Sequence, residues 1–103
     1  VGIASDMPVH IVGMEASTEF YATHMGGTQT TLDVDLQTRE LVEIARNAVI
    51  QFPDIGALLL ECSQLPTFAA DIQDVVNLPV FDYIGFIDMI YCSVVQRRYT
   101  GIL

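Results

Sequence analysis

Cys62 is the residue of this sequence whose type and position are best suited to chemistry. It ends a short apolar run and precedes a segment in which Pro66 favours the first turn of a helix. Parallel α/β sheets bind ligands just beyond the carboxyl ends of their strands. The free N–H groups at the start of a helix favour the thiolate, which is the reactive form of cysteine. The alternative is that Cys62 is a small apolar side chain of the core.

Other polar residues follow the ends of expected strands, where a sheet of this kind binds its ligand. Ser63 and Gln64 come directly after Cys62, Glu15 follows the first apolar run, and Asp82 follows the third. We expect these four residues to contribute to substrate binding. Asp82 precedes a helical segment, so its simpler role is to cap that helix, and its alternative role is to orient a substrate amine. Because the sequence holds neither Cys-x-x-Cys nor His-x-x-x-His, we expect no metal site.

The elements that position these residues are read from the apolar pattern. Leu41, Ala45, Ala48 and Phe52 form one stripe of a helix that is expected over about Val34 to Phe52, with Asp33 as its N-cap. Further helices are expected near Ser17, from Pro66 through Val76, and over Ile84 to Val95. Three apolar runs predict strands: Val9 to Met14, Ala57 to Cys62, and Pro79 to Phe81 or Asp82.

The alternation of strands and helices predicts an α/β fold of three layers, in which a parallel sheet of about three strands is flanked by helices. Residues 1–103 are expected to form a single domain. A parallel sheet is normally covered on both faces and protected at its edges, and three strands are few for that. We therefore expect a partner, most simply a second copy in a homodimer.

Composition excludes several classes of partner. The sequence contains thirteen acidic residues and four arginines. The resulting formal net charge of −9 opposes binding to nucleic acid or to an anionic membrane surface. The most apolar stretch, Val75 to Val95, is interrupted by Pro79, Asp82 and Asp88, so no membrane span is expected. Two cysteines are too few for a disulfide framework, which favours a cytoplasmic protein.

Several segments resemble the aspartate/glutamate racemase superfamily, and in particular its Asp/Glu/hydantoin racemase-like members. Ile55 to Pro66, with its Glu-Cys-Ser run, resembles the segment that holds the second cysteine of that family. The likeness continues, in order, through four further stretches: Val12 to Glu15, Glu19 with Phe20, Phe68 to Gln73, and Asn77 to Asp82.

The resemblance implies that the chain corresponds to the C-terminal half of a two-domain racemase. In that family, each half supplies one cysteine, and the two thiols exchange the α-proton of an amino acid without a cofactor. Cys62 would be the acid/base of this half, and Ser63 would help to bind the carboxylate where the family has Thr. Gln64 stands where glutamate racemases have His, which argues against glutamate as the substrate. The first cysteine of the family is missing, and Cys92 is expected to pack in the core.

Four functions follow from this interpretation. A second half, or a second copy that brings its own Cys62, would rebuild an isomerase of the racemase or epimerase type for a small carboxylate or amino acid. A truncated fragment would not catalyse anything by itself. A single cysteine suffices for a decarboxylase-like reaction, in which one thiol protonates a carbanion. Finally, the chain could be a binding or assembly module.

Overall fold

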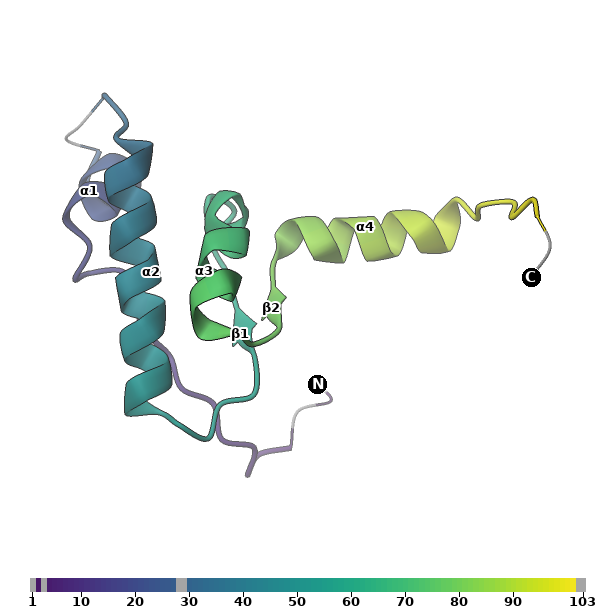
Figure 1. Ribbon diagram of the computed structural model, residues 1–103, viewed down its shortest axis with the longest axis horizontal. Coiled ribbons are helices and arrows are strands. Elements are labelled where there is room, and N and C mark those ends of the chain that lie inside the picture. The colour runs from purple at the N-terminus through teal and green to yellow at the C-terminus, as the bar shows by residue number, and fades with distance from the viewer. Residues whose placement is uncertain (1, 3, 28–29, 102–103) are drawn as a thin grey trace. The chain divides into compact units, whose positions relative to one another are not determined.

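The computed structural model describes residues 2, 4–27 and 30–101 (Figure 1). The chain divides into two compact units, residues 1–55 and 56–103, and each unit is considered by itself. Roughly half of the described residues are helical. The interpretation of 1–103 as one domain stays a prediction.

Unit 1 is built on one long helix. Its elements are α1 (Thr18–Phe20), the π-helical turn η1 (Tyr21–Met25) and α2 (Val34–Gln51). The expected helix with Asp33 as its N-cap is confirmed, because the Asp33 side chain accepts the Leu36 N–H at 2.9 Å. Helix α1 packs against α2. The buried side chains of α2 form one stripe along the helix: Gln37, Leu41, Ala45 and Ala48.

The segment before α1 is held to the far end of α2 by an aromatic contact. The His10 ring stacks on the Phe52 ring with centroids 3.9 Å apart and planes inclined by 12°. His10 Nε2 also lies 3.5 Å from Asp54 Oδ1. These contacts fix one point of a segment that has neither helix nor strand between residues 4 and 16.

Unit 2 contains a parallel β–α–β crossover followed by a further helix. Its elements are β1 (Leu58–Leu59), the 3-10 helix η2 (Leu65–Phe68), α3 (Ala69–Val76), β2 (Val80–Phe81) and α4 (Tyr83–Val94). The strands pair in register, Leu58 with Val80 and Leu59 with Phe81. Asn77 ends α3 in the left-handed region with φ at 53°. The buried apolar side chains of this unit are Leu60, Leu65, Phe68 and Ile72.

The predicted three-layer sheet is wrong. Val9 to Met14 forms no strand, and its Ile11 is 92% exposed. The other two strands are present but comprise two residues each. The reason is that a strand needs a neighbour for its N–H and C=O groups, and an apolar run supplies none by itself. The described residues therefore form a mostly helical structure with one short parallel pair.

Helix α4 occupies its predicted place but not its predicted environment. All residues from Tyr83 to Val94 are exposed, although the sequence predicts that an apolar stripe of this helix packs inside the protein. The expectation that Cys92 lies in the core is wrong for the same reason. Among the described helices, none combines the length and the apolar character that crossing a bilayer requires.

Candidate active site

The register of β1 and β2 brings two of the predicted site residues to one edge of unit 2. Leu59 pairs with Phe81, and the Leu60 N–H donates to the Phe81 carbonyl at 2.8 Å. Cys62 follows Leu60 by two residues, and Asp82 follows Phe81 directly. Because the strands are parallel, both residues follow carboxyl ends at the same edge. This is the location at which sheets of this type bind ligands.

Cys62 lies in a tight turn between β1 and η2. Its thiol is free and half-buried. The turn is closed by the Leu65 N–H, which donates to the Cys62 carbonyl at 3.1 Å. Ser63 and Gln64 occupy the turn and are exposed. The backbone thus holds the thiol just beyond the strand pair. The side chains of the next two residues, Ser63 and Gln64, are accessible to a ligand.

Asp82 has a structural role at the same edge. It is half-buried and is the N-cap of α4, where its Oδ1 accepts the Gly85 N–H at 2.8 Å. The simpler sequence interpretation of Asp82 as a helix cap is therefore confirmed. A role of Asp82 in binding substrate stays a prediction.

Glu15 is placed differently from the other predicted site residues. It belongs to unit 1 and is exposed, whereas Cys62 and Asp82 belong to unit 2. Its carboxylate folds back over Gly13, where a Cβ atom would collide with it. The local role of Glu15 is to cover this glycine, and its predicted contact with substrate stays a prediction.

A second polar cluster lies in unit 1 around the start of α1. The Glu40 carboxylate of α2 accepts the backbone N–H groups of Thr18 at 2.8 Å, of Glu19 at 2.9 Å and of Phe20 at 3.1 Å. The first N–H groups of a helix have no acceptor within the helix itself, so Glu40 caps α1 from another helix. Ser17 is at the helix start, as expected, and occupies the N-cap position of α1. Its hydroxyl makes no capping bond and donates to the Met14 carbonyl at 2.5 Å. The sequence pattern does not predict the capping role of Glu40, because Glu40 and Thr18 are 22 residues apart.

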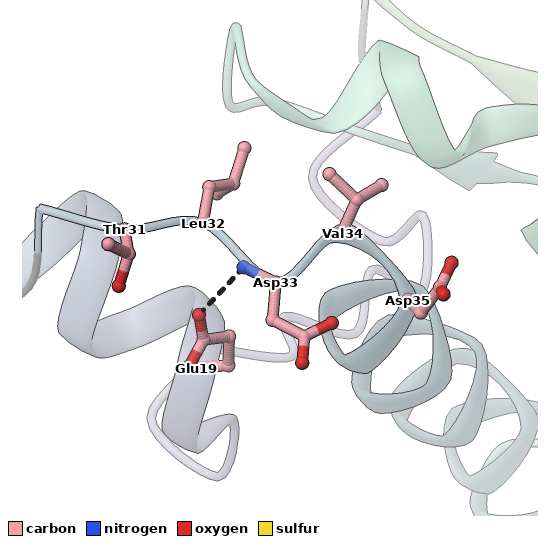
Figure 2. A pocket seen from close by; sticks show the side chains of 6 residues that line it. All are labelled: Glu19, Thr31, Leu32, Asp33, Val34 and Asp35. Atoms are coloured by element: carbon pink, nitrogen blue, oxygen red, sulfur yellow. Dashed lines mark hydrogen bonds between the residues drawn. The ribbon is translucent and has the colours of Figure 1, made fainter.

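The loop that leads into α2 lines a hollow open to solvent. The hollow is bounded by Glu19, Thr31, Leu32, Asp33, Val34 and Asp35. Figure 2 shows the Glu19 carboxylate directed at the backbone nitrogen of Asp33, and the two atoms are 3.0 Å apart. Two of the three carboxylates here are thus engaged with the start of α2. Among the described residues, His, Cys, Asp and Glu form no group of three that could hold a metal ion.

Gln37 is the most deeply buried polar side chain of unit 1. It is fully buried, and no partner is found for its Nε2 among the described residues. Its Oε1 lies 3.4 Å from Nε2 of His24, whose ring lies against Phe20 with centroids 4.6 Å apart. The signal that could have found Gln37 is its position on the apolar stripe of α2, four residues before Leu41.

Comparison with known proteins shows similarity to lyases. The chain is 35% identical to a dimethylsulfoniopropionate lyase of Durusdinium sp. clade D over 86 residues, which cover 76% of this chain and 28% of that protein. It is 30% identical over 93 residues to dimethylsulfoniopropionate lyase 5 of Emiliania huxleyi (strain CCMP1516), covering 90% of this chain and 18% of that protein. Dimethylsulfoniopropionate lyase 7 of the same strain is 33% identical over 96 residues, which cover 89% of this chain and 27% of that protein.

The chain therefore spans only 18% to 28% of the length of these curated relatives. No family model matches the chain. No solved structure matches it significantly either.

These findings correct the interpretation as half of a racemase. The relatives are named as lyases, a different family, and no family model supports a racemase. The expectation of an isomerase is therefore wrong, and so is the two-cysteine racemase that it implied. The single-cysteine decarboxylase-like alternative is closer to the findings, because decarboxylases are themselves lyases.

Proposed function

We propose that this chain forms part of a lyase that acts on dimethylsulfoniopropionate, with Cys62 as the base. The observation that carries the proposal is the similarity to lyases named for this substrate over three quarters or more of the chain. The placement of a free thiol at the carboxyl edge of a parallel strand pair supports Cys62 as the reacting group.

The reaction is an elimination. Dimethylsulfoniopropionate carries a carboxylate at one end and a dimethylsulfonium cation at the other, with two carbons between them. The Cys62 thiolate takes a proton from the carbon next to the carboxylate. The electron pair of that C–H bond forms the double bond between the two carbons, and the C–S bond breaks with its electrons on sulfur. Dimethyl sulfide and acrylate leave, and the Cys62 thiol returns its proton to solvent.

The neighbours of Cys62 supply polar groups for the two charged ends of this substrate. The Ser63 hydroxyl and the Gln64 amide donate to the carboxylate, on which negative charge accumulates during proton removal. The Asp82 carboxylate at the same edge supplies the opposite charge for the sulfonium cation. The predicted small carboxylate substrate is thereby refined to one that also carries a cation.

The proposal is tested by exchanging a segment of a known enzyme. This chain replaces the matching segment of the Durusdinium lyase, and dimethyl sulfide is measured by gas chromatography of the headspace. We expect the soluble chimera to release dimethyl sulfide. In the chimera, Cys62→Ser should lower the rate at least ~100-fold, as expected for loss of a general base. The matched control, Cys92→Ser, removes the other thiol of the chain, which lies on α4 away from the turn that holds Cys62, and should stay within about twofold of the parent.

Two outcomes contradict the proposal. A soluble chimera that releases no dimethyl sulfide would show that this chain does not supply a working part of such a lyase. A chimera in which Cys62→Ser leaves the rate unchanged would remove Cys62 from the reaction.

A further inference from the structure

Unit 2 exposes an apolar surface that its own residues do not cover. The surface is formed by Leu59 and Phe81 on the strand pair and by Phe86, Ile87, Ile90 and Val94 on α4. Leu59 is 67% and Phe81 is 60% exposed, and because they are register partners they lie side by side on one face of the sheet. Parallel sheets occur almost only with both faces covered. We refer to these six residues as the uncovered surface.

Helix α4 adds the larger part of this surface. Its side chains are apolar on nearly all sides, and Asp88 is its only charged residue. The exposed fractions run from 47% at Ile90 to 74% at Val94. A helix that is apolar all round is ordinarily buried inside a protein or in a membrane. The exposure of α4 therefore points to a missing partner.

A lipid bilayer is a poor match for α4. Its 12 residues rise roughly 18 Å, whereas the hydrocarbon core of a bilayer is about 30 Å thick. A second copy of this chain would have to pack through the same apolar face of α4. At about 100° per residue, however, Asp88 lies on the side of α4 opposite Phe86, Ile90 and Val94. A contact between two copies through that face would leave this carboxylate in solvent, so the oligomeric state measured below separates a second copy from another partner.

We propose that the uncovered surface is the docking site for the additional polypeptide that dimethylsulfoniopropionate lyases carry beyond the region this chain matches. That region is 28% of the Durusdinium relative and 27% of one Emiliania relative, so most of each relative lies outside it. This polypeptide lays a parallel strand along an open edge of the β1–β2 pair and packs apolar side chains over Leu59, Phe81 and α4. It also covers the edge that holds Cys62, which excludes water from the reaction. The identity of the partner rests on the proposed function.

The first test uses the chain alone. Ile87→Glu places a charge on the uncovered surface, and Ile50→Glu, on α2, is the matched control because Ile50 is 71% exposed. We expect both variants to keep the thermal midpoint of the parent. The fluorescence of the apolar dye ANS should fall severalfold with Ile87→Glu only. A large loss of thermal stability with Ile87→Glu alone would show that α4 is covered within the chain, which overturns the proposal.

The second test supplies the partner. The tagged chain is co-expressed with the Durusdinium lyase from which the matching segment has been deleted, and the complex is recovered by the tag. We expect recovery of both polypeptides, with amide hydrogen exchange in α4 slowed at least tenfold. Ile87→Glu should abolish recovery, and Ile50→Glu should not. The proposal is overturned if the tagged chain is recovered without the deleted Durusdinium lyase. It is also overturned if the Ile87→Glu variant recovers as much of that lyase as the parent chain does.

Other occupants give different results. A dimer of the wild-type chain in sedimentation that becomes a monomer with Ile87→Glu would assign the surface to a second copy. Flotation with phosphatidylcholine vesicles that Ile87→Glu abolishes would assign it to lipid. Either result overturns the proposal. Binding is measured without substrate, so Cys62→Ser should dock normally, and a failure of the proposed chemistry is distinguishable from a failure of docking.

Discussion

The Glu40 carboxylate accepts the Thr18 backbone N–H at 2.8 Å, across 22 residues of sequence. The same carboxylate receives the next two N–H groups of α1. A three-residue helix cannot satisfy its own first donors, so α1 depends on α2 for its N-terminal cap. The relationship ties the short helical segment of unit 1 to its long helix, beside the bond from the Asp33 N–H to the Glu19 carboxylate at 3.0 Å.

Replacement of Glu40 should therefore destabilise unit 1. We expect Glu40→Ala to lower the free energy of unfolding by about 1–2 kcal/mol, because it leaves backbone donors without a charged acceptor. Urea denaturation followed by circular dichroism measures the change. Glu43→Ala is the control on the same helix, since Glu43 makes an exposed pair with Arg46 at 3.4 Å and such pairs contribute at most about 1 kcal/mol. Equal losses in the two variants would refute the capping role of Glu40.

Removal of the Gln37 amide should stabilise the chain. Its Nε2 is buried without a partner among the described residues, and such a group costs about 1–3 kcal/mol. Gln37→Met keeps nearly the same volume, so we expect a gain of about 0.5–1 kcal/mol after loss of the weak His24 contact. Thermal denaturation compares it with Gln51→Met at the exposed end of α2. A loss of stability at Gln37 would show that its amide makes a favourable interaction, such as one with an ordered water.

Asn77 should tolerate glycine but not alanine. Its φ of 53° lies in the left-handed region, where a Cβ atom is unfavourable and Asn is among the few side chains found regularly. We expect Asn77→Ala to cost about 1 kcal/mol in the free energy of unfolding, and Asn77→Gly to leave it nearly unchanged. Chemical denaturation of both variants checks this. A Gly variant as unstable as the Ala variant would show that the Asn side chain, rather than the backbone angle, matters.

The hydroxyl of Ser63 should matter for activity in the chimeric lyase proposed above. We expect Ser63→Ala to lower kcat/KM roughly 10-fold or more, the effect of losing one hydrogen bond to a charged group. Ser63→Thr should keep most of the activity because it keeps the donor. Initial rates of dimethyl sulfide release over a range of substrate concentrations separate KM from kcat. Parent-like kinetics in Ser63→Ala would remove this residue from substrate binding.

Local patterns predicted the helices well, whereas contacts between distant residues escaped prediction. Helix α2 and its Asp33 cap follow from periodicity and one side-chain type, both of which act within a few residues. The segment Val9 to Met14 has the composition of a strand, but strand formation depends on a neighbour elsewhere in the chain. The sequence predicted the apolar character of α4 and also that it is buried, and only the structure revealed the exposure.

In the candidate site, too, features set by neighbouring residues could be predicted, and features set by distant residues could not. The position of Cys62 at a strand end could be predicted, because Gly56 and Pro66 limit the run to strand length. That the strands before Cys62 and Asp82 run parallel follows from the predicted order of elements, and the register of β1 and β2 confirms the parallel pairing. The prediction that Glu15 follows a third strand is wrong, because residues 9–14 form no strand.

The stacking of His10 on Phe52 bears on the order in which unit 1 folds. These rings come from opposite ends of the unit, so their contact closes a long loop, at an entropic cost of roughly 3 kcal/mol. Helix α2 forms from neighbouring residues and pays no such cost. We therefore expect the segment before α1 to join late in folding and to detach first in unfolding. A protease added under native conditions should cleave between residues 4 and 16 before it cuts α2.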